Sequence, residues 1–132
     1  MAKAKTAKTT KTTRKKSALP KQVTQAVAAA LDKQAHALTI LDLKKAAGFT
    51  DYFVICTGNN SRQVKAIADH VRDTLAEDGV KPAHVEGNDR SEWILLDYFD
   101  FIVHIFAPET RTFYDLERLW GSAEIVPHEG LA

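Results

Sequence analysis

The chain has 132 residues, of which 45% are hydrophobic and 27% are charged, and its formal net charge at pH 7 is +1. This size and composition are typical of one globular domain and leave no room for a second. A single cysteine excludes an intrachain disulfide framework. No apolar run reaches the roughly 20 residues of a membrane-spanning helix. Because the N-terminus also lacks the apolar segment of a signal peptide, we expect a cytoplasmic protein.

Charge is divided unevenly along the chain. Residues 1–16 contain seven Lys or Arg and no acidic residue, whereas the remainder contains eleven basic and seventeen acidic residues. Since no apolar side chain larger than alanine follows Met1 within the N-terminal segment, we expect residues 1–18 to form a disordered basic tail. Such a tail is suited either to contact RNA phosphates, including those of rRNA, or only to improve solubility. The candidate nucleic-acid contacts are Lys11, Arg14, Lys15 and Lys16.

Two apolar stripes with helical spacing follow the tail. Pro20 suits the first turn of a helix, and a second helix is expected after Asn60, which with Gln63 resembles an N-cap pair. Gly79 is expected to end this second helix. The stripes consist of Val23, Ala26, Val27, Ala30 and Leu31 in the first helix, and of Val64, Ile67, Ala68, Val71 and Leu75 in the second.

The remaining elements are strands and one further helix. Strands are expected at 37–43, 51–58 and 82–87, and a hairpin within 91–106. A last helix is expected from Pro108 to Gly121, with Phe113, Leu116 and Trp120 in the core and Leu119 on the same side. The element order predicts an α/β (α+β-like) single domain, residues 19–126, with a mixed sheet and flanking helices. Residues 127–132 are expected to be a C-terminal tail.

The hairpin SEWILLDYFDFIVHIF mixes apolar and polar residues. A two-residue loop at Phe99 and Asp100 would pair Trp93 with Phe106, Leu95 with His104 and Asp97 with Ile102. These six residues would share one face, and the opposite face would be almost wholly aliphatic or aromatic. Apolar area combined with a few polar groups is typical of a surface that binds a partner. A buried, hydrogen-bonded His104 is the main alternative.

The enzyme interpretation finds little support in these residues. The face that would hold Asp97 and His104 carries no Ser, Thr or Cys nucleophile, and the other histidines lack metal-ligand spacing. The segment TGNNSRQ has one glycine and no GKS or GKT, so it is not a P-loop. We therefore expect no catalytic residue, metal or cofactor. A nucleotide- or RNA-binding domain that uses the turn 57–61 or the basic tail is the alternative function.

Four segments in a fixed order resemble the ribosomal silencing factor (RsfS, or Iojap) family. They are DYFVICTGNNSRQVKAIADHV, VEG, EWILLDYFDFIVHIF and RTFYDLERLW, and the resemblance runs from about Leu19 to Val126. It implies a nucleotidyltransferase-like core without catalytic acids, in a translational repressor that is not an enzyme. It also implies binding to the large ribosomal subunit through ribosomal protein uL14, which would block joining of the small subunit and lower protein synthesis under nutrient limitation. Family members can form homodimers.

The resemblance also implies which residues bind. The uL14-binding region maps onto the hairpin and the last helix, although the hairpin register turns Tyr98 inward. The family usually has glycine where this chain has Phe99, and a phenylalanine with positive φ is strained by roughly 1–2 kcal/mol. Either the turn is of another type or Phe99 is an exposed apolar tip. The expected binding residues are Trp93, Leu95, Asp97, Tyr98 and His104, with Arg111 and Tyr114 in addition.

Overall fold

The computed structural model of the chain describes residues 19–128. The predictions for the basic tail and for residues 129–132 lie outside this range. No helix between residues 19 and 128 is long and apolar enough to cross a membrane. The elements in chain order are α2 (Lys21–Asp32), β1 (His36–Asp42), β2 (Tyr52–Thr57), α3 (Ser61–Ala76), β3 (His84–Glu86), β4 (Trp93–Asp97), β5 (Phe101–Phe106), α4 (Pro108–Tyr114), α5 (Leu116–Leu119) and β6 (Glu124–Val126).

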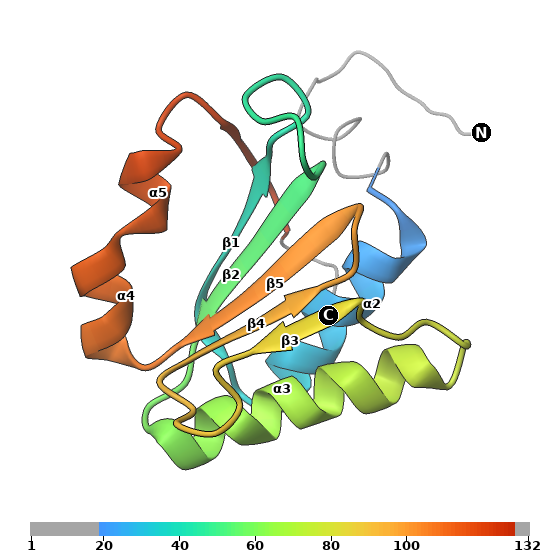
Figure 1. Cartoon of the computed structure of the whole chain (residues 1–132), viewed down its shortest axis with the longest axis vertical. Helices are drawn as coiled ribbons and strands as arrows, with labels where there is room; N and C mark the ends of the chain where they lie inside the picture. Colours follow the sequence, from blue (N-terminus) through green and yellow to red (C-terminus); the bar gives the residue numbers. More distant parts are fainter. Residues whose placement is uncertain (1–18, 129–132) are drawn as a thin grey trace.

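The strands form one mixed sheet between two layers of helices (Figure 1). The strand order is β3-β4-β5-β2-β1-β6, in which β2 and β5 are parallel and all other neighbours are antiparallel. Helices α2 and α3 lie on one face, and α4 and α5 lie on the other (Figure 1). The predicted single domain with a mixed sheet and flanking helices is confirmed. Strand β6, which pairs with β1, was not predicted.

Helix α3 begins at the predicted cap. Asn60 Oδ1 accepts a hydrogen bond from the backbone N–H of Gln63 at 2.9 Å, and Gln63 Oε1 accepts one from the backbone N–H of Asn59 at 2.6 Å. The first bond satisfies a donor that the first helical turn leaves without an intrahelical partner, and the second attaches the residue before the cap to the helix. Gly79 follows the helix with φ 77°, a conformation that glycine adopts without steric cost.

The predicted last helix is instead two short helices, α4 and α5. Asp115, between them, has φ 51° and closes α4 through its N–H to the Arg111 carbonyl. A left-handed residue reorients the next turn, so the helical spacing no longer marks one face. The prediction that Phe113 is in the core is therefore wrong, because this side chain is 79% exposed; Leu119 is exposed too, Leu116 is buried and Trp120 is half-buried.

The predicted hairpin register is confirmed. Trp93 pairs with Phe106, and the other predicted pairs of β4 and β5 follow. Phe99 has φ 72°, and the Asp100 N–H donates to the Tyr98 carbonyl across it at 2.9 Å. This three-residue hydrogen bond around a positive φ is that of a γ-turn, which is rare and strained for a residue with a Cβ.

Candidate functional site

An aromatic surface lies where β4 meets α4. It consists of Trp93 and Leu95, which are half-buried on β4, and of Phe113 and Tyr114, which are exposed on α4; we call these four residues the β4–α4 surface. The Trp93 ring packs 4.6 Å from the Tyr114 ring and 4.9 Å from the buried Phe106 ring, between centroids. These contacts hold the indole in place, and an ordered aromatic side chain loses little entropy when a partner covers it.

His104 lies beneath this surface rather than on it. It is 3% exposed, its Nδ1 accepts a hydrogen bond from Trp93 Nε1–H at 3.1 Å, and its ring packs 4.4 Å from that of Phe53. Burial lowers the pKa of His104 to about 3, so the imidazole is neutral near pH 7. Its buried Nε2 has no hydrogen-bond partner among residues 19–128. His104 is thus a buried residue that holds Trp93, and not an exposed binding residue.

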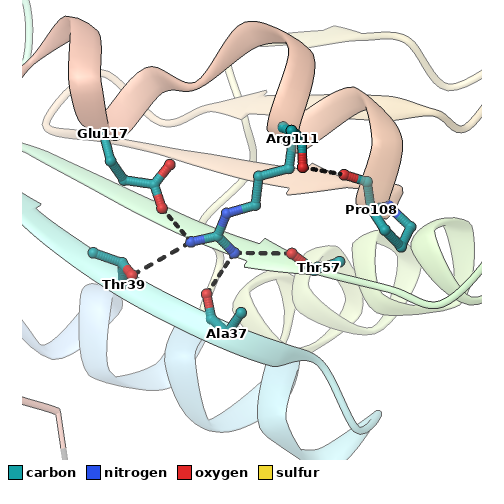
Figure 2. Close-up of polar contacts among 7 residues, drawn as sticks. Ala37, Thr39, Thr57, Pro108, Arg111 and Glu117 are labelled. Carbon is teal, nitrogen blue, oxygen red and sulfur yellow. Dashed lines mark hydrogen bonds and ion pairs between the residues drawn. The ribbon is translucent and has the colours of Figure 1, made fainter.

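Arg111 joins α4 to the sheet (Figure 2). Its Nη1 donates to the Ala37 carbonyl and, at 2.8 Å, to Thr57 Oγ1, while its Nη2 contacts Glu117 Oε2 and, at 3.4 Å, Thr39 Oγ1. The side chain is only 14% exposed. A guanidinium with this many fixed partners attaches α4 to β1 and β2, and is not available as a first contact for another protein.

Two further predicted binding residues are also engaged within the chain. Tyr98 lies on the α2–α3 face, where its ring stacks on Phe101 at 4.9 Å, and burial raises its pKa to about 12. Its predicted surface role does not agree with this position. Asp97 is half-buried, and its Oδ1 accepts the Phe99 N–H at 2.9 Å, so this carboxylate supports the hairpin turn. Of the seven predicted residues, the structure brings Trp93, Leu95 and Tyr114 together at the surface.

The turn at residues 57–61, proposed as the alternative nucleotide site, uses its polar side chains internally. Thr57 accepts from Arg111, Asn59 Oδ1 lies 2.8 Å from His36 Nε2, and Asn60 caps α3. The observed contacts are those of a capped turn. In the described part of the chain, no three His, Cys, Asp or Glu side chains gather closely enough to hold a metal ion.

Sequence reasoning missed a groove beside the β4–α4 surface. A cavity of about 470 Å³ lies between residues 87–92 and α4. The sequence did not indicate this groove because the helical spacing assigned Phe113 to the core, whereas the helix breaks at Asp115 and Phe113 is exposed. The residues that line this groove are Gly87, Asp89, Arg90, Glu92, Trp93, Glu109, Thr110, Phe113 and Tyr114.

Comparison with known proteins identifies relatives along most of the chain. The family model described as "Ribosomal silencing factor during starvation" matches residues 15–131. A Bacillus subtilis protein named ribosomal silencing factor RsfS is 41% identical over 100 residues, which are 76% of this chain and 85% of that protein. The chloroplastic protein Iojap of Zea mays is 35% identical over 95 residues, 72% of this chain but 41% of the maize protein.

Solved structures agree with this assignment. A crystal structure of a Chromobacterium violaceum protein matches with a TM-score of 0.74 at 36% identity, covering 76% of this chain and 83% of that one. One from Bacillus halodurans matches with a TM-score of 0.71 at 35% identity, covering 80% and 95%. The similarity therefore extends over sequence and fold together, and this chain belongs to the ribosomal silencing factor family.

Proposed function

We propose that this protein represses translation by binding the large ribosomal subunit through ribosomal protein uL14 and preventing the small subunit from joining. Its family membership supports a regulatory role at the ribosome. The observation that carries the proposal is the β4–α4 surface, where Trp93, Phe113 and Tyr114 expose aromatic area on an ordered scaffold. Aromatic side chains that a partner buries on binding supply much of the binding energy at protein interfaces.

The mechanism we propose is occupancy and not turnover. The polar side chains of the turn at 57–61 serve the fold, since Thr57 accepts from Arg111 and Asn60 caps α3. Such a factor acts by mass action: at a free concentration 100 times its dissociation constant, it biases the subunit equilibrium by about 2.7 kcal/mol. Action in the compartment that holds the ribosomes, the cytoplasm in a bacterium, is part of the same proposal.

Sedimentation of purified ribosomal subunits tests this function. Wild-type protein added in excess to large and small subunits is expected to travel with the large subunit and to shrink the peak of joined ribosomes. Adding the protein after the subunits have joined should have a smaller effect, because the joined small subunit would cover the site. Protein that stays at the top of the gradient, with joining unchanged, would contradict the proposal.

The basic tail and self-association are separate proposals. A contact of Lys11, Arg14, Lys15 and Lys16 with rRNA should weaken steeply with salt and disappear when residues 1–16 are deleted. Docking through the β4–α4 surface should survive that deletion. A homodimer, measured by analytical ultracentrifugation of the free protein, would compete with ribosome binding if it used the same surface.

A further inference from the structure

We propose that the groove between residues 87–92 and α4 receives a basic side chain of the protein partner that docks on the β4–α4 surface. This inference rests on the function proposed above and specifies the chemistry of its partner. The groove and the surface are continuous, because Trp93, Phe113 and Tyr114 belong to both. A partner that covers the Trp93 indole would therefore place its neighbouring residues at the mouth of the groove.

The groove is formed before any partner arrives. The first of its walls, the loop at residues 87–92, turns at Gly87, which has φ 83°, and a Cβ there would lie 1.9 Å from the Trp93 carbonyl oxygen. The Ser91 N–H donates to the Gly87 carbonyl at 2.9 Å and closes the loop. The Ala107 N–H donates to the Glu92 carbonyl at 2.8 Å and joins the loop to the start of α4. Since the two walls are linked by backbone hydrogen bonds, little ordering cost remains for binding.

The net negative charge of the groove favours a positively charged occupant. Asp89, Glu92 and Glu109 contribute three carboxylates against the single guanidinium of Arg90. Glu92 and Glu109 are exposed and form no ion pair within residues 19–128. A lysine or arginine would gain these carboxylates as partners, whereas an RNA phosphate would be repelled by them. The acidic rim therefore favours a cationic protein segment over the rRNA backbone.

The aromatic residues favour the same occupant. The rings of Trp93, Tyr114 and Phe113 follow one another with centroid distances of 4.6 and 5.0 Å. Aromatic faces attract ammonium and guanidinium groups, and they also pack against the aliphatic stem of a lysine or arginine. One long basic side chain can thus satisfy the carboxylate rim with its head group and the rings with its stem.

Two matched pairs of variants test this proposal against purified large subunits and purified uL14. The double variant Glu92→Gln with Glu109→Gln removes the two unpaired groove carboxylates. Its control, Asp73→Asn with Glu77→Gln, removes two exposed carboxylates at the C-terminal end of α3, in its last turn and at its C-cap, and gives the same change in net charge. At low salt, we expect the groove variant to bind about tenfold more weakly than the wild type, and the control variant to differ from the wild type less than twofold. The difference in affinity between the groove variant and the wild type should become smaller as the salt concentration rises.

The second pair probes the aromatic wall. Phe113→Ala removes an exposed ring of the groove, and Ile125→Ala removes an exposed side chain on β6, at the opposite edge of the sheet. We expect Phe113→Ala to weaken binding about tenfold and Ile125→Ala to leave it unchanged. Thermal unfolding of all four variants should stay close to that of the wild type, because the replaced side chains are exposed.

The outcomes separate the groove from the docking function. Failure of the wild type to bind either probe would overturn the proposed function and this inference with it. Wild-type binding that the groove variant and its control reduce equally would overturn the groove alone. Tighter binding by the Glu92→Gln, Glu109→Gln variant would also overturn it, because that result would indicate a phosphate occupant.

Discussion

The two faces of the sheet differ in how completely helices cover them. On one face, α2 and α3, with 12 and 16 residues, cover aliphatic side chains such as Val54 and Ile105, which are 0% exposed. On the other, α4 and α5, with 7 and 4 residues, cover an aromatic set that includes His104 and Phe106 and leave Trp93 and Leu95 half-buried. Complete coverage maximises buried apolar area, whereas incomplete coverage leaves part of the same sheet exposed, and our proposal assigns this part to a protein partner.

The largest expected effect is on the covered face. Ile105→Ala should lower the free energy of unfolding by about 3–4 kcal/mol, because a fully buried Ile leaves a cavity that closely packed helices cannot fill. Leu95→Ala, on the incompletely covered face, should cost about 1 kcal/mol. Urea unfolding of both variants measures the difference. Equal losses would mean that the two faces contribute alike to stability.

A pH titration of stability tests the burial of His104. Its folded-state pKa, about 3, lies below the usual 6.5, so between these values only the unfolded state binds the proton. Stability should therefore fall as the pH decreases below 6.5, by about 1.4 kcal/mol per pH unit, or about 3 kcal/mol at pH 4.5.

The carboxylates of the chain also titrate in that range, and a variant separates their contribution. His104→Gln stays neutral at every pH, so the difference between wild-type and variant unfolding free energies isolates the histidine. This difference should begin to fall near pH 6.5 and flatten only near pH 3. A difference that is constant between pH 7 and pH 4.5 would contradict the buried, neutral imidazole and its role beneath Trp93.

The sequence predicted features that depend on local pattern. The two-residue loop at Phe99 and Asp100 gave the hairpin register, and the Asn60 cap gave the start of α3, because each depends on residues close along the chain. What it missed depends on distant partners. Strand β6 has three residues without periodicity and exists by pairing with β1. The hydrogen bonds that withdraw Arg111 from the surface likewise join it to distant strands.

For the candidate site the same distinction applies. Trp93 and Leu95 followed from the strand pattern, whereas the exposure of Phe113 depends on the left-handed Asp115, and no local signal predicted this break. His104 fell on the predicted face, but whether an inward residue on that face is covered depends on how far α4 and α5 extend over the sheet. Burial of this kind is a tertiary property and is not readable from alternation alone.

Replacing each tryptophan of the incompletely covered face in turn tests whether the two ends of this face differ in their contribution to binding. Trp93→Ala should weaken binding to purified large subunits by about 2 kcal/mol, because an ordered aromatic anchor is lost. Trp120, which packs on Phe49 and Phe53 at the other end, is the matched control. Trp120→Ala should lower stability and leave the affinity unchanged. Equal loss of affinity in both variants would extend the docking surface over the whole face.

The smallest expected effect concerns the hairpin tip, which joins β4 to β5. Phe99 is 72% exposed, and its positive φ costs roughly 1–2 kcal/mol of strain, which glycine would relieve. The larger entropy of glycine in the unfolded state would offset about 0.5–1 kcal/mol of this gain. Phe99→Gly should therefore raise the free energy of unfolding by up to about 1.5 kcal/mol. Urea unfolding and large-subunit affinity, measured on the same variant, separate two reasons for a phenylalanine here.

A more stable variant with unchanged affinity would mean that Phe99 is a tolerated strain outside the docking surface. A more stable variant that binds less tightly would mean that the exposed ring contacts the partner, and the surface would then extend from Trp93 along β4 to the tip. Asp97 offers a further test at the same turn, because its Oδ1 accepts a hydrogen bond from the Phe99 N–H at 2.9 Å. Asp97→Asn keeps an acceptor for that bond, so any loss of affinity it causes would come from the lost charge and not from a rearranged turn.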